Sequence, residues 1–293
     1  MNGSVEILQK AGGCKHRAAR LTVLCDNRAV RAGLQTEHGL AVWIETPDIR
    51  VLFDTGQGTA LAANAATLGI DLSSADAIVL SHGHYDHTGG LACALSKAHG
   101  ARLYYHPDAL IPRYSVQPDG SVRPIGMRPE ALAALQNCAC RTVVTGPTAI
   151  GGAVHVTGPV PRTTGFEDTG GRFYRDRDLH SADTVPDDMA LWIETAGGLV
   201  TVTGCCHSGI INTLRLVTAA SSSRDVIALI GGLHLLHASD DRIARTADGL
   251  NAMLRLERVI PLHCSGEDSV ERLRERYTGR MEPGHVGFSF EID

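Results

Sequence analysis

The chain lacks the features that mark a nucleic-acid-binding or membrane protein. Its 27 Lys and Arg residues are outnumbered by 32 Asp and Glu, and the formal net charge of -5 provides no basic excess. No run of about 18 apolar residues occurs, which argues against a membrane-spanning helix. The opening residues, MNGSVEILQKAGGCKHRAAR, contain no apolar segment typical of a secretory signal. We therefore expect a small-molecule substrate, with no nucleic-acid and no membrane partner.

Regularly paired cysteines are also missing. The eight cysteines are scattered, and neither NCAC (137–140) nor GCCHSG (204–209) has the spacing of a zinc ribbon. Scattered cysteines are typical of a reducing compartment, so we expect a reduced, cytoplasmic protein. The sequence leaves the oligomeric state open, with a homo-oligomer among the alternatives.

The chain does contain alternating strand and helix patterns, in two similar halves. Its hydrophobic content of 43% suffices for a large core. In the first half the strand patterns are residues 20–27, 39–46, 49–56, 76–81 and 101–107, and the helical patterns are 59–70 and 89–100. In the second half the strand patterns are 189–195, 199–204, 226–232 and 258–266, and the helical patterns are 209–220 and 241–257.

The segment between the halves, residues 107–175, is rich in Gly, Pro and Thr and is expected to form short strands and substrate-facing loops. Two halves that each combine a sheet with helices favour a four-layered αββα sandwich over two independent domains. We therefore predict an α/β fold (α+β in some schemes) that forms a single domain over residues 1–293.

One short stretch, SHGHYDHTGG (81–90), concentrates donor side chains directly after an apolar strand. His82 and His84 are two residues apart and can face one point, while Asp86 and His87 can face a neighbouring point. Imidazole nitrogens and carboxylate oxygens suit zinc, manganese or iron. These donors would crowd a single tetrahedral ion that must also keep an open position, so the stretch predicts two metal ions.

Several motifs together resemble the metallo-β-lactamase superfamily. They are LFDTG (52–56), SHGHYDHTGG (81–90), VTVTGCCHSG (200–209) and PLHCSG (261–266). With LCDN, EHGLAVWIE and GGLHLL, they look like one branch, labelled 7,8-dihydropterin-6-yl-methyl-4-(β-D-ribofuranosyl)aminobenzene 5'-phosphate synthase. The resemblance implies that His82 and His84 bind one metal, and that Asp86, His87 and His263 bind the other. It also implies that Asp54 supports the metal loop without binding a metal.

The sequence departs from the familiar superfamily pattern at TGC (203–205), where an aspartate is expected in place of the cysteine. We expect His207 to complete the first metal site and Cys206 to point into packing. Cys205 is either a thiolate ligand or bridge, or a small buried residue below the site. Alternative ligands in the neighbouring segment are His180, Asp183 and Asp188.

The function predicted from these residues is hydrolysis of a small, anionic substrate by a metal-activated water. Asp86 would hold the nucleophile, and His234, which ends another apolar strand, would stabilise an oxyanion or protonate the leaving group unless it is a core residue. His106, Arg113 and Tyr114 are open candidates for an anion-binding pocket, and no role is expected for His38.

The expected cofactors are two divalent metal ions, with zinc first and manganese or iron as alternatives. Three other functions stay open. They are the synthase-type transfer implied by the branch label, iron-dependent redox chemistry on the same fold, and a non-catalytic metal-binding regulatory module.

Overall fold

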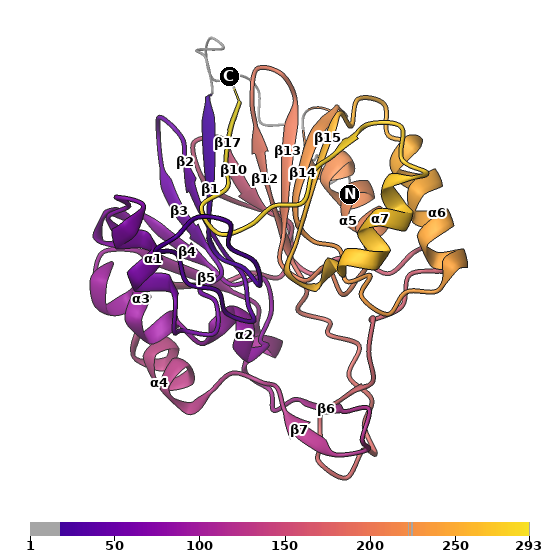
Figure 1. Ribbon diagram of the computed structural model, residues 1–293. Coiled ribbons are helices and arrows are strands. Elements are labelled where there is room, and N and C mark those ends of the chain that lie inside the picture. The colour runs from indigo at the N-terminus through magenta and orange to yellow at the C-terminus, as the bar shows by residue number, and fades with distance from the viewer. Residues whose placement is uncertain (1–17, 222, 224, 293) are drawn as a thin grey trace, which may run out of the picture.

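Two large β-sheets pack face to face and carry helices on their outer faces (Figure 1). The computed structural model describes residues 18–221, 223 and 225–292. The order of the first seven-stranded sheet is β17 (Ser289–Ile292), β1 (Ala19–Cys25), β2 (Ala41–Glu45), β3 (Arg50–Phe53), β4 (Ala77–Val79), β5 (Arg102–Tyr105) and β8 (Arg141–Val143). The order of the second is β16 (Arg280–Met281), β15 (Arg258–Leu262), β14 (Val226–Gly232), β13 (Leu199–Thr203), β12 (Ala190–Glu194), β10 (Val154–Val156) and β9 (Thr148–Gly151).

The strands are apolar on both faces because each sheet is covered on both sides. In β2, Val42 and Ile44 point into the core between the sheets, whereas Trp43 packs under the helices of the first half. In β13, Val200 and Val202 point into the same central core. This alternation produces one core between the sheets and one beneath each helical layer.

The helices cover the sheets as the predicted sandwich requires. α1 (Leu61–Thr67), α3 (Leu91–Lys97) and α4 (Pro129–Asn137) contribute to or flank the core outside the first sheet, and α5 (Ile210–Ala220), α6 (Asp240–Asn251) and α7 (Glu267–Arg274) cover the second. The four-layered αββα prediction is therefore confirmed. No helix within the described residues is both long enough and apolar enough to cross a membrane.

Two secondary-structure predictions were wrong in detail. The segment 107–175 contains α4, although only strands and loops were expected there. The helix has a readable signal, since Pro129 occupies its first turn and is followed by strong helix formers. The helix predicted over 241–257 ends at Asn251, at the start of a short turn before β15.

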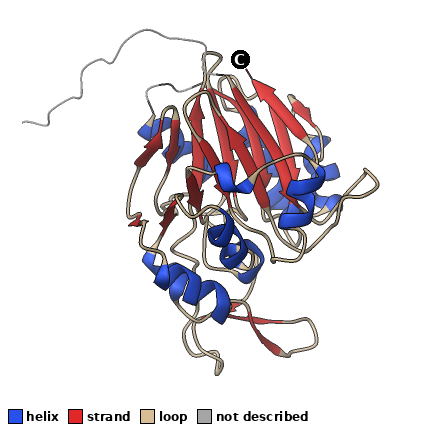
Figure 2. Cartoon of the chain, turned by 90° about the vertical axis from the view of Figure 1, so that its left-hand side faces the viewer, coloured by secondary structure: helices blue, strands red, loops and turns tan. Residues whose placement is uncertain are grey.

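The carboxyl ends of the parallel strands meet at one edge of the sandwich. β3, β4 and β5 run parallel in the first sheet, and β13, β14 and β15 run parallel in the second. A small third sheet, in the order β11 (Phe173–Tyr174), β6 (Tyr114–Val116), β7 (Val122–Pro124), lies beyond the same edge. Its β6–β7 hairpin extends below the body of the molecule (Figures 1 and 2). Side chains that follow the parallel strands therefore converge beside this hairpin.

Candidate metal centre

Three histidines form the first group of candidate ligands. His82 and His84 follow β4, and His207 follows β13 on the facing sheet. One ring nitrogen from each lies within 4.8 Å of the others, and all three residues are buried. The structure thus brings together the residues predicted to hold one metal.

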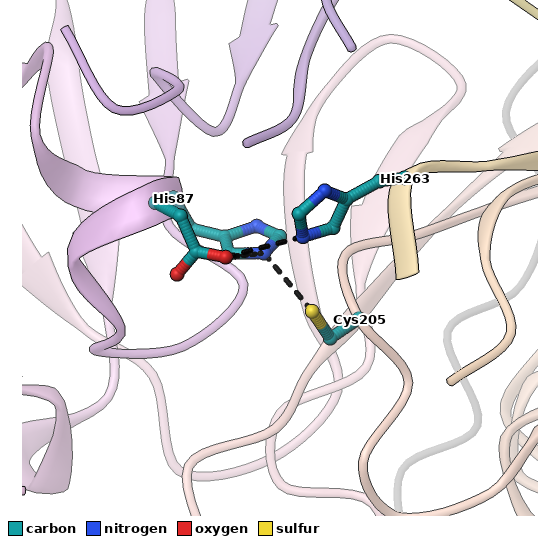
Figure 3. Close-up of side chains that lie close together, drawn as sticks. His87, Cys205 and His263 are labelled. Atoms are coloured by element: carbon teal, nitrogen blue, oxygen red, sulfur yellow. Dashed lines mark hydrogen bonds and ion pairs between the residues drawn. The ribbon is translucent and has the colours of Figure 1, made fainter. Parts of the chain in front are cut away.

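The second group combines four residues from three parts of the chain. Asp86 and His87 lie in the short helix α2 (Tyr85–Thr88), Cys205 follows β13, and His263 follows β15. The Nε2 atom of His87 is 3.1 Å from Cys205 Sγ, and the Nε2 atom of His263 is 3.1 Å from Asp86 Oδ2. Figure 3 shows His87, Cys205 and His263 converging on one point. Cys205 therefore lies beside the second predicted set of ligands.

The buried nitrogens fit a bound cation. The Nε2 atoms of His84 and His207 are buried and have no hydrogen-bond partner among the described residues. His207 donates its Nδ1–H to the carbonyl oxygen of Thr169 at 2.9 Å, which leaves a lone pair on Nε2. A buried polar atom without a partner lowers stability, so these lone pairs are suited to bind a cation. Nitrogen, carboxylate and thiolate donors together suit zinc, manganese or iron.

Electrostatics keep the three imidazoles of the first group, and the Asp86 carboxylate, in metal-binding forms. Burial lowers the pKa values of His82, His84 and His207 well below the ordinary value, and repulsion from neighbouring imidazoles and, for His84, from Arg113 adds to this. Burial alone would raise the pKa of Asp86, but the neighbouring His87 and His263 hold it well below its usual range. The three imidazoles are therefore neutral and the carboxylate is ionised at neutral pH.

Asp54 contacts the second group directly through His87, and it reaches the first group through Ser81, whose hydroxyl lies 2.9 Å from His82 Nδ1. It accepts hydrogen bonds from the main-chain N–H and the hydroxyl of Ser81, each at 2.7 Å, and its Oδ2 lies 2.7 Å from His87 Nδ1. Burial alone would lower the pKa of His87, but the carboxylates of Asp54 and Asp86 raise it to about 9. Asp54 thus holds the His87 ring with Nε2 directed toward Cys205, and the structure places it where a supporting residue was predicted.

The backbone at this edge is strained at several non-glycine residues. Asp54, Cys206, His234 and His263 have φ angles of 58°, 65°, 47° and 50°. Such conformations persist only where the surrounding structure over-determines them, and they gather at functional sites. Sharp turns here direct side chains from several strand ends toward one point.

The turn after β13 separates the two vicinal cysteines as predicted. Cys205 points to the ligand groups, while Cys206 packs in the core under α5, with its Sγ 3.4 Å from Thr213 Oγ1. Burial raises the pKa of the Cys205 thiol well above its ordinary value, so the thiol ionises only beside a cation. Cys205 is therefore positioned as a ligand, and its coordination of a metal stays a prediction.

Gly204 allows this turn to approach the metal loop. A Cβ atom at position 204 would lie 2.1 Å from Ser81 Oγ, which is closer than real contacts allow. We expect Gly204→Ala to lower the free energy of unfolding by about 1–3 kcal/mol, because the overpacked methyl must push Ser81 away from Asp54. Thermal unfolding of the purified variants measures this. Gly100→Ala is the control, since no atom lies within 4 Å of its added Cβ, and equal losses in both variants would contradict the argument.

The alternative carboxylates do not join the ligand groups. Asp183 lies 2.8 Å from Arg113 Nε, and Asp188 accepts a hydrogen bond from Ser208 N at 2.7 Å. Asp188 therefore braces the turn that carries His207. His180 lies with Asp176 and Asp178 in an exposed loop instead.

Two further residues lie differently from what the sequence suggested. Arg113 was a candidate for anion binding, but its guanidinium is buried between Asp183 and Asp187, and Asp187 also accepts from Gly83 N in the metal loop. Arg113 thus stabilises the loop and is inaccessible to a substrate. No role was expected for His38, yet its Nε2 is 3.3 Å from Asp86 Oδ2 at the rim of the site.

His106 and Tyr114, the other anion-binding candidates, lie outside the pocket lining. His106 accepts a hydrogen bond from Asp108 N at 3.1 Å and so caps the short helix Pro107–Leu110. Tyr114 pairs with Tyr174 in the small sheet. Neither side chain is placed to bind a substrate at the metal ligands.

A pocket of about 340 Å³ opens above the ligands. His84, Asp86, His207 and His263 lie at its base, and its side wall comes from the small sheet and the segment before β11. The Phe173 ring of this wall is centred 5.4 Å from the His84 ring and 5.3 Å from the His207 ring. The wall lies within residues 107–175, where short strands and substrate-facing loops were expected, but sequence reasoning did not single out Phe173. It also missed Cys264, which lines the pocket beside Cys205.

His234 also faces the pocket. Its ring centroid is 4.1 Å from that of His207, and its Nδ1 is buried without a hydrogen-bond partner among the described residues. Gly170 packs directly against the ring, since a Cβ there would lie 1.8 Å from His234 Cδ2. The predicted placement of His234 at the site therefore agrees with the structure, and its chemical role stays a prediction.

Comparison with known proteins agrees with this geometry. The sequence matches the metallo-beta-lactamase superfamily over residues 35–261. It is 31% identical over 268 residues to an uncharacterized protein of Methanocaldococcus jannaschii, covering 91% of this chain and 98% of that protein. It is 28% identical over 264 residues to 7,8-dihydropterin-6-methyl-4-(beta-D-ribofuranosyl)-aminobenzene-5'-phosphate synthase of the same organism, covering 86% of this chain and 89% of that protein.

A solved structure is similar over almost the whole fold. Tm1679, described as a metal-dependent hydrolase of the beta-lactamase superfamily, aligns with a TM-score of 0.79 and 32% identity, covering 94% of this chain and 99% of that one. A four-layered sandwich with clustered candidate metal ligands at one edge defines the class. The chain belongs to the metallo-beta-lactamase superfamily.

Proposed function

We propose that the protein is a metal-dependent hydrolase that uses a metal-activated water on a small, anionic, ester-like substrate. The observation that carries this proposal is the pair of adjacent donor groups at the base of an open pocket. The 32% identity to a metal-dependent hydrolase of similar structure supports it. Such a protein needs no nucleic-acid or membrane partner.

The chain's own residues would divide the binding of two divalent metals, with zinc first. His82, His84 and His207 would hold one ion, and Asp86, His87 and His263 the other, with Cys205 between the groups. Bound metals would lower the pKa of a water and polarise the substrate's oxygen. Manganese and iron remain compatible with the same donors.

Two residues would act directly on the reacting groups. Asp86, whose carboxylate is kept ionised by the surrounding imidazoles, would orient the attacking water by accepting its hydrogen bond. His234 would donate a hydrogen bond to the developing oxyanion or a proton to the leaving group, because its ring lies in the pocket beside His207.

Metal content tests the first step of the proposal. Elemental analysis of the purified, metal-loaded chain should give about two ions per chain, because two separate donor groups are present. Hydrolysis of a panel of phosphate and carboxylate esters should require those ions and return when they are added back. A reproducible content of one ion, with Asp86 and His263 turned away in the crystal structure, would contradict the binuclear site.

A transferase is the second candidate function, and the 28% identity to the dihydropterin-ribofuranosylaminobenzene phosphate synthase favours it. The metals would then stabilise a phosphorylated leaving group of one substrate, and the pocket would have to admit a second. Incubation with a dihydropterin pyrophosphate and the ribofuranosylaminobenzene phosphate separates the two candidates. A joined product supports transfer, whereas simple release of phosphate or pyrophosphate supports hydrolysis.

A further inference from the structure

One wall of the pocket carries an arginine that has no ion-pair partner among the described residues. Arg172 precedes β11, is exposed, and lines the pocket above the candidate metal ligands. It is the one permanent cation among the described residues of the pocket lining, where Asp86 is the one carboxylate. Asp86 already contacts His38 and His263, so the positive charge of Arg172 has no counter-charge in the described pocket lining.

The backbone fixes Arg172 on the wall formed by the small sheet. Its carbonyl oxygen accepts a hydrogen bond from Val116 N at 3.3 Å, which continues the pairing of β11 with β6. On the neighbouring strand end, Gln117 donates to the hydroxyl of Ser115 at 2.7 Å, and both side chains also line the pocket. The remaining N–H of Gln117 and the hydroxyl proton of Ser115 are available to an acceptor.

Phe173 adds an apolar ring to the same wall, close to the candidate metal ligands. It follows Arg172 directly in the chain, and its ring is edge-on to His207 with an interplanar angle of 90°. Arg172 and Phe173 line the same pocket as the candidate metal ligands, so a molecule that fills it can contact an apolar ring and a cation together. The lining thus supplies candidate metal ligands, an apolar ring and a permanent cation.

We infer that Arg172 binds a second anionic group of the substrate, a carboxylate or a phosphate, remote from the bond that is broken. A planar guanidinium matches either group through two parallel N–H donors. The substrate class is then a small molecule with an apolar or aromatic body and an anion at the end away from the metals. This inference rests on the proposed function, since it places the reacting bond at the candidate metal centre.

Binding of two-ended anions tests the inference without requiring turnover. Metal-loaded protein is titrated calorimetrically with α,ω-dicarboxylic acids of increasing chain length and with the matching monocarboxylic acids. The first carboxylate occupies the metals in both series, so the affinity ratio reports the second anion. At the best chain length we expect the diacid to bind about tenfold tighter or more. Matching ω-phosphonocarboxylic acids show whether phosphate is preferred to carboxylate.

Two matched substitutions assign that preference to a residue. Arg172→Gln should abolish the diacid preference while metal content stays unchanged, and Arg172→Lys should restore part of it. Arg123→Gln removes the same charge from β7 of the same small sheet, outside the pocket lining, and should keep the preference within about twofold.

Three outcomes would overturn the inference. They are a wild-type protein without diacid preference at any length, an Arg172→Gln protein that keeps it, and equal loss in the Arg123→Gln protein. The proposed hydrolase function can be refuted independently of this inference. A preference that depends on Arg172 in a protein that hydrolyses no ester would refute the hydrolase and leave the anion site, whereas ester hydrolysis without the preference would refute the anion site alone.

Discussion

Replacement of His207 by alanine should remove the first metal and the activity together. The hydrogen bond to Thr169 leaves the His207 Nε2 lone pair directed into the group formed with His82 and His84. Loss of one of three imidazole ligands should cost more than the roughly 10–100-fold in metal affinity that loss of a supporting residue costs. Elemental analysis should show the content falling from about two ions to about one per chain, with ester hydrolysis at background.

The vicinal cysteines provide the controls for this experiment. Cys206→Ser should leave metal content and activity nearly unchanged, because its sulfur packs beneath α5. Cys205→Ser should fall between Cys206→Ser and His207→Ala, because its sulfur belongs to the second group of candidate ligands and also lies within 4.8 Å of a ring nitrogen of His207. Full metal content in His207→Ala would show that the imidazole is not a ligand, and the turn after β13 would then have to be assigned to substrate binding or to packing.

Much of this site could be predicted because it depends on where strands end. Asp54, His82, His207 and His263 each follow closely on an apolar strand that is recognisable from the sequence. Parallel strands of a sheet have their carboxyl ends at one edge, so these side chains were bound to lie near each other once the strand order was known. The four-layered fold follows from the same pattern, because strands that are apolar on both faces need a cover on both sides.

The individual residues of the pocket wall could not be predicted, although substrate-facing loops were expected in that segment, because their positions depend on contacts between distant segments. Phe173 reaches the metal ligands only because β11 pairs with β6, which lies more than fifty residues earlier in the chain. Arg113 carries a guanidinium, which is typical of anion-binding sites. Its side chain is buried and paired with two carboxylates, so it stabilises the structure instead. His38 carries no strand-end signal and reaches Asp86 through a loop. Such residues become functional or structural through packing, which periodicity does not report.

Asp54→Asn should weaken metal binding by about 10–100-fold and leave the fold intact. One carboxylate oxygen accepts from Ser81 N, and the other accepts from the Ser81 hydroxyl and faces His87 Nδ1. An asparagine can place an oxygen at only one of these positions. If its amide nitrogen faces His87, it donates to Nδ1 and shifts the ring proton to Nε2, which then cannot bind a metal. If the amide is turned round, its nitrogen faces Ser81 N, and the loop loses that bond.

Competition with a chromogenic chelator measures this loss, and thermal unfolding checks the fold. Asparagine tolerates the positive φ of residue 54, so the backbone there need not change. Asp26→Asn is the matched control, because the Asp26 oxygens accept from main-chain N–H groups only, of His263 at 2.7 Å and of Arg28 at 3.2 Å. An asparagine can keep the bond to His263 and lose the longer one, and no ligand imidazole changes its tautomer. We expect the control to change metal affinity by less than about threefold. Equal losses in both variants would indicate general destabilisation, and a crystal structure with a metal bound directly to Asp54 would refute its supporting role.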